Sequence, residues 1–385
     1  MGEPRPARRG RRRDRRVYLG SHPVLFALLA ATRRAPVRRI GRIVLVHDAA
    51  PFADALRRVP VDRSAERTTA GAARRATGGD GFLFDQDGAG HRQTRRGAAS
   101  VFGADGVARL RPVWLEVLRR RLAPLGDGAE VDVVDLVVEL SGASTAAMLD
   151  VSVPAHALTD AARSAAALAA RGHLPGLRWP GRARRDRAAT ASAAAELTRL
   201  LGGPADEAAR GGMLAVASIN TTVAAIPRAV AWCADDRLWP AADRADSRAA
   251  LVAELLRVTA PSPVLPRVVA GAAELADTRP LRADTRPLRA DTRPLRAGDR
   301  LLLVARHAAR AGAPHPDPAA PVPAAVGHLV FGTGPHHCPG ARLAHAQLDD
   351  VLAALAPYRP VVTGARVDRR SALPGWARLT IRATR

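Results

Sequence analysis

Residues 331–344 place one cysteine, Cys338, in a glycine-bounded loop directly before a helical stretch. Gly332 and Gly334 allow a tight backbone turn and a close approach to a flat ligand, because glycine has no Cβ atom. Gly340 stands where the helix opens, so the positive helix end should face the sulfur and favour the thiolate. The segment predicts a thiolate presented to a metal, and the alternative is that Cys338 is a small buried apolar residue.

The complete pattern, Phe331-Gly-Thr-Gly-Pro-His-His-Cys-Pro-Gly340, is similar to the cysteine loop of the cytochrome P450 family. The fixed offsets of its phenylalanine, glycines, histidine and cysteine make it more specific than a single glycine motif. The resemblance implies that the Cys338 thiolate is the axial ligand of the iron in haem b (iron protoporphyrin IX). It also implies that the haem is contacted by Phe331, Gly332, His336 and Gly340.

A haem carries propionate groups, and buried carboxylates need cationic partners. His91 and Arg95 are four residues apart, so both project from one face of a predicted helix. Arg267 follows Pro266 in a segment that resembles the one from which a family arginine reaches a propionate. The resemblance therefore implies four propionate anchors, which are His91, Arg95, Arg267 and His336. Without it, the spacing of His91 and Arg95 is equally that of a solvated helix face.

Glu254 and Arg257 stand three apart on an apolar helical segment and resemble the structural Glu-x-x-Arg pair of the family. Family members place a further arginine before the cysteine loop to complete this network, but residues 311–326 contain none. Either Arg310 or His315 substitutes for it, or the network is shorter.

Residues 212–232 are expected to form the helix on the oxygen side of the haem. Their centre, Ala217-Ser-Ile-Asn-Thr-Thr222, resembles the family's Ala-Gly-x-acid-Thr-Thr stretch, with Ser218 in place of glycine and Asn220 in place of the acid. The resemblance implies that Thr221 hydrogen-bonds to oxygen at the iron. Asn220 does not titrate, so a proton must arrive through water, Ser218, a threonine hydroxyl or the substrate.

The 385 residues carry a formal net charge of +23 at pH 7, and all 59 of the basic positions counted as Lys or Arg are arginine. Two cysteines are too few for a disulfide framework or a structural zinc site. Alanine- and leucine-rich segments at helical spacing dominate residues 97–355. Strands are expected at 40–47, 301–304 and 379–381, and a helix from 51 to 58. The sequence predicts a mainly α fold with a small β part, in one haem-containing domain over 17–385.

The arginine-rich residues 1–16 are expected to form a solvated, disordered tail. The apolar run 24–31 that follows resembles the core of a secretory signal, but it is short and Arg33 and Arg34 follow it closely. No window is expected to reach the ~18 apolar residues of a membrane span. These features predict a cytoplasmic monomer without membrane or nucleic-acid contacts.

Residues 276–296 consist of three copies of Ala-Asp-Thr-Arg-Pro-Leu-Arg. Three short copies are too few for a solenoid, and a proline in each copy favours a solvated loop. We expect a tandem expansion of one connection; the alternative is a loop that docks a partner.

The family resemblance implies a monooxygenase that inserts one oxygen atom of O2 into a small organic substrate of bacterial secondary metabolism. Its electrons would come from a ferredoxin or flavodoxin with its reductase, and an acidic donor suits the basic chain. Segments 64–84 and 156–195 would border the substrate.

Two alternative functions remain. Because Asn220 replaces the family's acid, the protein could be a peroxide-driven or radical-coupling haem oxidase. Because the N-terminal tail is basic, it could be a haem-binding sensor or a nucleic-acid-binding protein. Pro339 offers no N–H to the sulfur, which would lower the iron's potential.

Overall fold

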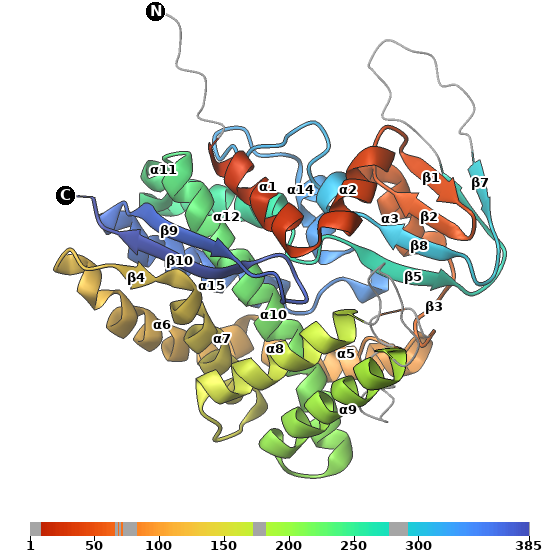
Figure 1. The fold of residues 1–385 in the computed structure, drawn as a ribbon, viewed down its shortest axis with the longest axis horizontal. Coiled ribbons are helices and arrows are strands. Elements are labelled where there is room, and N and C mark those ends of the chain that lie inside the picture. Colours follow the sequence, from red (N-terminus) through yellow and green to blue (C-terminus); the bar gives the residue numbers. More distant parts are fainter. Residues whose placement is uncertain are drawn as a thin grey trace, which may run out of the picture.

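Helices make up most of the protein, which we describe from a computed structural model covering residues 9–65, 68, 71, 83–171, 182–276 and 292–384. The strands gather at two places on this helical body (Figure 1). The α-helices are α1 (Arg9–Ser21), α2 (Pro23–Thr32), α3 (Ala49–Arg58), α5 (Gly88–Phe102), α6 (Ala104–Gly126), α7 (Val133–Leu149), α8 (Ala155–Arg171), α9 (Arg182–Leu201), α10 (Ala205–Asp235), α11 (Trp239–Asp243), α12 (Ala245–Thr259), α13 (Ala305–Ala308), α14 (Ala324–Gly327) and α15 (Ala341–Leu355). Short 3-10 helices are η1 (His328–Phe331), η2 (Gly334–His336) and η3 (Ala356–Tyr358).

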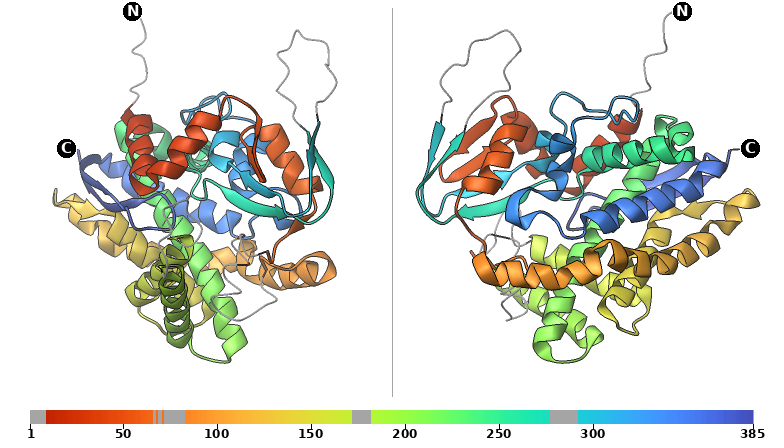
Figure 2. Two further views of the ribbon diagram at one scale, coloured as in Figure 1. Left: turned by 45° about the vertical axis from the view of Figure 1, so that its right-hand side comes forward. Right: turned by 180° about the vertical axis from the view of Figure 1, so that it is seen from behind.

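The main core forms around α10, which is longer at both ends than the expected 212–232. Its apolar side chains pack with those of α6, α7, α12 and α15. Seen from behind (Figure 2), α12 (green), α15 (blue) and α6 (gold) lie in successive layers beside it. An 18-residue window of α10 has a mean hydropathy of 1.4, which is enough for a membrane span by length and composition alone. The expectation that no window comes near such a span was therefore wrong, although 56% of this window is buried inside the protein.

A five-stranded sheet of order β1-β2-β8-β5-β3 forms a second, smaller core with α3. Its strands are β1 (Val37–Ile40), β2 (Ile43–Val46), β3 (Val61–Asp62), β5 (Leu265–Val269) and β8 (Arg300–Leu303). The single strand expected at 40–47 is instead the end of β1, a turn and β2, because Gly41 has a φ of +57° and reverses the chain. The strand expected at 301–304 corresponds to β8, and the helix expected from 51 corresponds to α3.

A three-stranded antiparallel sheet closes the C-terminal end. It has the order β4-β10-β9, formed by β4 (Val131–Asp132), β9 (Val361–Val367) and β10 (Trp376–Arg382). The strand expected at 379–381 lies within β10.

The N-terminal tail prediction was wrong for residues 9–16, which are helical in α1. Asp14 interrupts the arginine run, and its buried carboxylate pairs with Arg228 at 2.6 Å and Arg310 at 2.6 Å. Gly10 allows α1 to lie directly against Trp232, because a Cβ there would come within 2.5 Å of that ring. These contacts fix α1 onto α10. Residues 1–8 lie outside the described part of the chain.

The repeat segment begins and ends in a hairpin of β6 (Ala273–Ala276) and β7 (Thr292–Leu295). The loop expectation was wrong for the third copy, because Leu295 is buried and pairs in register with Ala273. Residues 277–291 lie outside the described part of the chain.

Candidate active site

A cavity of about 940 Å³ separates α10 from the cysteine loop. It is bordered by α5, α8, α9, α10, the strand β5 and the segment between η1 and α15. The candidate ligand, cofactor-binding and oxygen-side residues all line it: His91, Arg95, Ser218, Asn220, Thr221, Arg267, Phe331, Gly332, His336, Cys338 and Gly340. Residues from four separate parts of the sequence thus meet at one site.

The cysteine loop is shaped by its glycines. Gly332 and Gly334 both have a φ of +75°, which L-residues with a side chain rarely adopt. Between them and α15 the chain turns back, so that the backbone N–H of Cys338 donates to the carbonyl of Phe331 at 2.8 Å. Gly340 is the residue before α15, and the N–H of Ala344 donates to its carbonyl at 3.0 Å.

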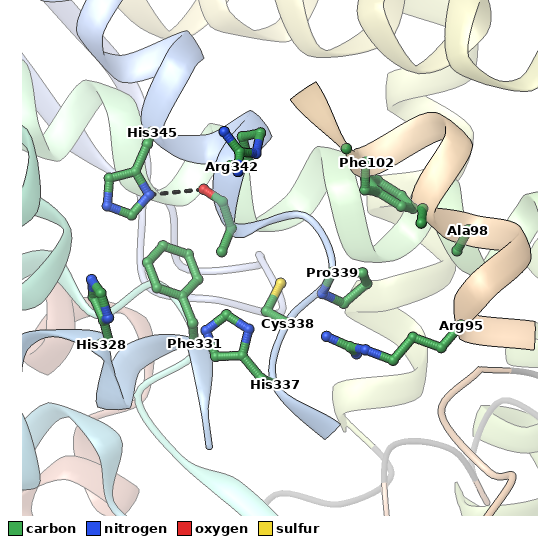
Figure 3. Close-up of a pocket in the computed structure, with 13 residues that line it drawn as sticks. Arg95, Ala98, Phe102, His328, Phe331, His337, Cys338, Pro339, Arg342 and His345 are labelled. Atoms are coloured by element: carbon green, nitrogen blue, oxygen red, sulfur yellow. Dashed lines mark hydrogen bonds between the residues drawn. The ribbon is translucent and has the colours of Figure 1, made fainter. Parts of the chain in front are cut away.

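Cys338 also borders a second cavity of about 580 Å³ on the other side of its loop. Figure 3 shows the sulfur at the centre of this space, with the ring of Phe331 on one side and Arg95 on the other. His345 is held by a hydrogen bond between its Nδ1 and the carbonyl of Ala341 at 2.8 Å. Arg95, Phe331 and Cys338 line both cavities, so the sulfur lies where the two adjoin.

Burial raises the pKa of the Cys338 thiol, although a hydrogen bond from the backbone of Gly340 and the nearby Arg95 charge both lower it. Burial therefore opposes the expected ionisation of Cys338, whereas Gly340 and Arg95 favour it. Pro339 has no N–H to donate to the Cys338 sulfur, and the backbone of Gly340 donates to it instead. The thiolate consequently needs a bound cation to be stable, as metal-ligating cysteines do.

Two imidazoles lie together at the edge of the large cavity. His91 of α5 and His336 of η2 stack with ring centroids 3.9 Å apart. The Nε2 atoms of both are buried without a hydrogen-bond partner within the described residues, and the carboxylate of Asp87 lies 3.6 Å from the Nε2 of His336. Burial is the main cause that lowers the pKa of His336 to about 4 and also lowers the pKa of His91.

Two guanidinium groups complete this edge. Arg267 projects from β5, and its Nε is buried and unpartnered, as is the Nε of Arg63 just after β3. Burial and then the charge of Arg63 lower the pKa of Arg267 to about 10. Arg63 also acts electrostatically on both imidazoles. The sequence analysis missed Arg63, because no pattern distinguishes one arginine in so arginine-rich a chain.

The oxygen-side candidates lie on α10. Thr221 Oγ1 donates to the carbonyl of Ala217 at 2.8 Å. The Nδ2 of Asn220 donates to carbonyls within α10 and on α8, at 2.8 Å and 3.3 Å, so its amide nitrogen is occupied. Ser218 Oγ accepts a hydrogen bond from Thr145 Oγ1 of α7 at 3.4 Å, which ties this hydroxyl to the neighbouring helix.

Glu254 and Arg257 form a buried ion pair on α12. Arg257 also donates to the carbonyls of Ala313 at 2.5 Å and His315 at 2.8 Å. The backbone N–H groups of Asp317 and Val322 donate to the Glu254 carboxylate, each at 3.1 Å. The chain before the cysteine loop therefore satisfies the pair through its backbone. Arg310 does not substitute for the missing arginine, because it binds Asp14 instead.

The fold of this chain is similar to those of several solved protein structures. A crystal structure of CYP108D1 from Novosphingobium aromaticivorans matches with a TM-score of 0.72 and 20% identity, over 96% of this chain and 98% of that one. CYP109E1 from Bacillus megaterium, in complex with testosterone, matches with a TM-score of 0.71 and 17% identity over 96% and 100%. A mutant of P450 EryK in complex with erythromycin B matches with a TM-score of 0.70 and 20% identity over 94% and 96%.

The chain has the cytochrome P450 fold. The expected mainly α architecture is thereby confirmed over almost the whole length of the chain. No family model and no curated protein match the sequence. At this level of identity the P450 likeness establishes the fold, and the chemistry must be argued from the residues around the cavity.

Proposed function

We propose that the protein is a haem-thiolate monooxygenase with Cys338 as the axial ligand of haem b. The observation that carries the proposal is the edge of the large cavity, where the buried Nε atoms of Arg63 and Arg267 have no hydrogen-bond partner within the described residues and lie beside the imidazoles of His91 and His336. Buried guanidinium donors without acceptors require anions. Haem propionates would satisfy them, and Cys338 and the α10 residues that line the same cavity would hold the rest of the haem.

When bound, the haem would supply the activation of O2 and the oxidation of a C–H bond, with electron density donated by the thiolate. The protein's own residues would position the haem. Arg95, Arg267, His91 and His336 would hold the propionates, with Arg63 as a further donor, while Gly332 and Phe331 would contact the macrocycle. The buried Glu254–Arg257 pair fixes the chain before the cysteine loop and so holds the ligand in place.

The α10 residues define how protons would reach the oxygen side. The Thr221 hydroxyl lies on the cavity and would exchange its internal hydrogen bond for one to bound oxygen. Asn220 cannot relay a proton by titrating, and its amide nitrogen is engaged by two carbonyls. Ser218, hydrogen-bonded to Thr145, and ordered water remain as the carriers.

The substrate would be a small, mainly apolar organic molecule. The distal wall of the cavity, from α8, α9 and α10, is lined largely by alanine, leucine and valine, and by the hydroxyls of Thr190 and Thr198. The charged side chains of the cavity lie instead at the edge where Arg63 and Arg267 meet His91 and His336. We place the activity in bacterial secondary metabolism, with a ferredoxin or flavodoxin as the electron donor.

The spectrum of the reduced, carbon-monoxide-bound protein tests the proposal. Thiolate ligation should give the red-shifted absorption band of this family, and Cys338→His should abolish it while haem is retained. Cys233→Ala is the matched control, because Cys233 is also a free thiol but is buried in α10, away from the cavity lining. A red-shifted band that survives Cys338→His, or one lost in Cys233→Ala alone, would refute Cys338 as the ligand.

A further inference from the structure

The helix α2 has an apolar face that nothing in the described structure covers. Phe26 and Leu29 form its buried side, packed near Tyr18 and Leu45. On the other side Val24 is 65% exposed and Leu28 is 42% exposed, with Ala27 and Ala31 between and beyond them also exposed. Positions 24, 27, 28 and 31 follow helical spacing, so they form one continuous face.

This face continues onto the neighbouring hairpin and into the large cavity. Ile40, at the end of β1, is 46% exposed. Leu28 and Ile40 also line the 940 Å³ cavity, together with Leu25 and Ile43. Figure 1 shows α2 along the same edge of the molecule as β1 and β2. We call the exposed side chains of Val24, Ala27, Leu28, Ala31 and Ile40 the α2 patch.

The segment that carries the α2 patch is rich in positive charge. Residues 9–47 contain eleven arginines and a single carboxylate, Asp14, which is buried in ion pairs. All of these arginines except Arg13 are exposed. Arg34 and Arg38, which flank the patch in sequence, form no ion pair within the described residues.

We propose that the α2 patch docks on an anionic lipid bilayer. Val24 and Leu28 would enter the boundary between headgroups and acyl chains, while Arg34 and Arg38 would lie against lipid phosphates. An apolar helix face flanked by arginine is the composition that binds membrane interfaces, and anionic lipid attracts such clusters. A second copy of the chain suits the patch poorly, because contact would bring two arginine-rich surfaces together.

Docking in this orientation would place the part of the cavity lining formed by Leu28 and Ile40 against the bilayer. Apolar molecules dissolved in the lipid could then enter the cavity without crossing water. This consequence rests on the proposed function, whereas the docking itself does not.

Co-sedimentation of the full-length, haem-loaded protein with lipid vesicles tests the docking. We expect binding to vesicles of equal parts phosphatidylcholine and phosphatidylglycerol, and at least tenfold weaker binding to phosphatidylcholine alone. The double variant Val24→Asp with Leu28→Asp should weaken binding to the mixed vesicles at least tenfold. Its matched control replaces Leu115 and Val361, which are 40% and 44% exposed elsewhere on the surface, by Asp and should bind like the wild type.

A charge-reversal pair separates specific docking from general attraction by a basic protein. Arg34→Glu with Arg38→Glu should weaken vesicle binding more than Arg119→Glu with Arg120→Glu, which change the same charge at exposed positions on α6. Equal losses in both pairs, or unchanged binding in the Val24 and Leu28 variant, would overturn the proposal. So would a dimer in light scattering that this variant dissociates. The carbon-monoxide spectrum of each variant shows independently whether the haem site is intact.

Discussion

At the residue scale, the edge of the large cavity is defined by donors that are buried without acceptors. Polar groups in protein interiors are nearly always hydrogen-bonded, so the buried Nε atoms of Arg63 and Arg267, which have no partner within the described residues, indicate an anionic ligand beside His91 and His336. The lowered pKa values of these groups have the same origin, because burial and mutual repulsion disfavour their charges until that ligand binds. Arg63 is the member that no motif predicted.

Arg63→Gln should release haem faster than the wild type. A hydrogen bond to a charged group contributes about 1.5–3 kcal/mol, which corresponds to a roughly 10- to 100-fold faster loss. Transfer of hemin to an excess of apomyoglobin measures this rate. Arg92→Gln, at an exposed position on α5 beside His91, should leave the rate unchanged. An equal rate in the Arg63 and Arg92 variants would remove Arg63 from the haem site.

At the element scale, α1 is held onto α10 by charges that local patterns did not reveal. Asp14 is surrounded by Arg228, Arg306 and Arg310, all of which lower its pKa against the opposing effect of burial. Arg13 adds a pair with Asp235 at 2.5 Å, and the N–H of Gly10 donates to Asp236 at 3.0 Å. The arginine run is therefore a packed helix instead of a tail, because one carboxylate gives it a buried anchor.

Asp14→Asn should lower the free energy of unfolding by about 3–5 kcal/mol, since it leaves buried arginines without their counter-charge. Denaturant unfolding followed by circular dichroism measures the change. Asp160→Asn, at an exposed position on α8, is the control and should stay within about 0.5 kcal/mol of the wild type. A loss below about 1 kcal/mol in Asp14→Asn would mean that water already solvates this cluster.

At the scale of the whole molecule, burial and then excess positive charge set the response to acid. His47 and His307 meet between β2 and α13, with their Nδ1 atoms 2.9 Å apart, and the Nε2 of His47 lies 3.2 Å from Thr32 Oγ1. Burial, followed by the Arg33 charge, lowers their pKa values to about 4 and about 2. Arg306 and Arg310 add to the effect on His307.

Both imidazoles are held neutral in the folded state, so the unfolded chain binds more protons once the pH falls below the ordinary value of 6.5. Stability should therefore be fully present above pH 6.5 and decline towards pH 4, by up to about 1.4 kcal/mol per pH unit for each imidazole. Urea unfolding at a series of pH values measures the slope. His307→Gln should flatten it, whereas the exposed His156→Gln should not. A slope unchanged by His307→Gln would contradict this account.

The sequence by itself determined the features that depend on local spacing. The glycines of the cysteine loop, the Glu254–Arg257 pair on one helix turn and the helical segment around Thr221 all follow from short-range geometry, and the structure has them at those residues. The candidate residues were also predicted as one set, although only through resemblance to a family whose loop they share.

Only the tertiary structure decided which groups from distant segments become neighbours and which lose their water. It brought Arg63 to the cavity edge, anchored Asp14 among three arginines, replaced the missing loop arginine by backbone groups and left the α2 patch exposed. It also buried Cys338, and burial opposes the ionisation that Gly340 and Arg95 favour, because the cost of burying a charge depends on all the surrounding residues.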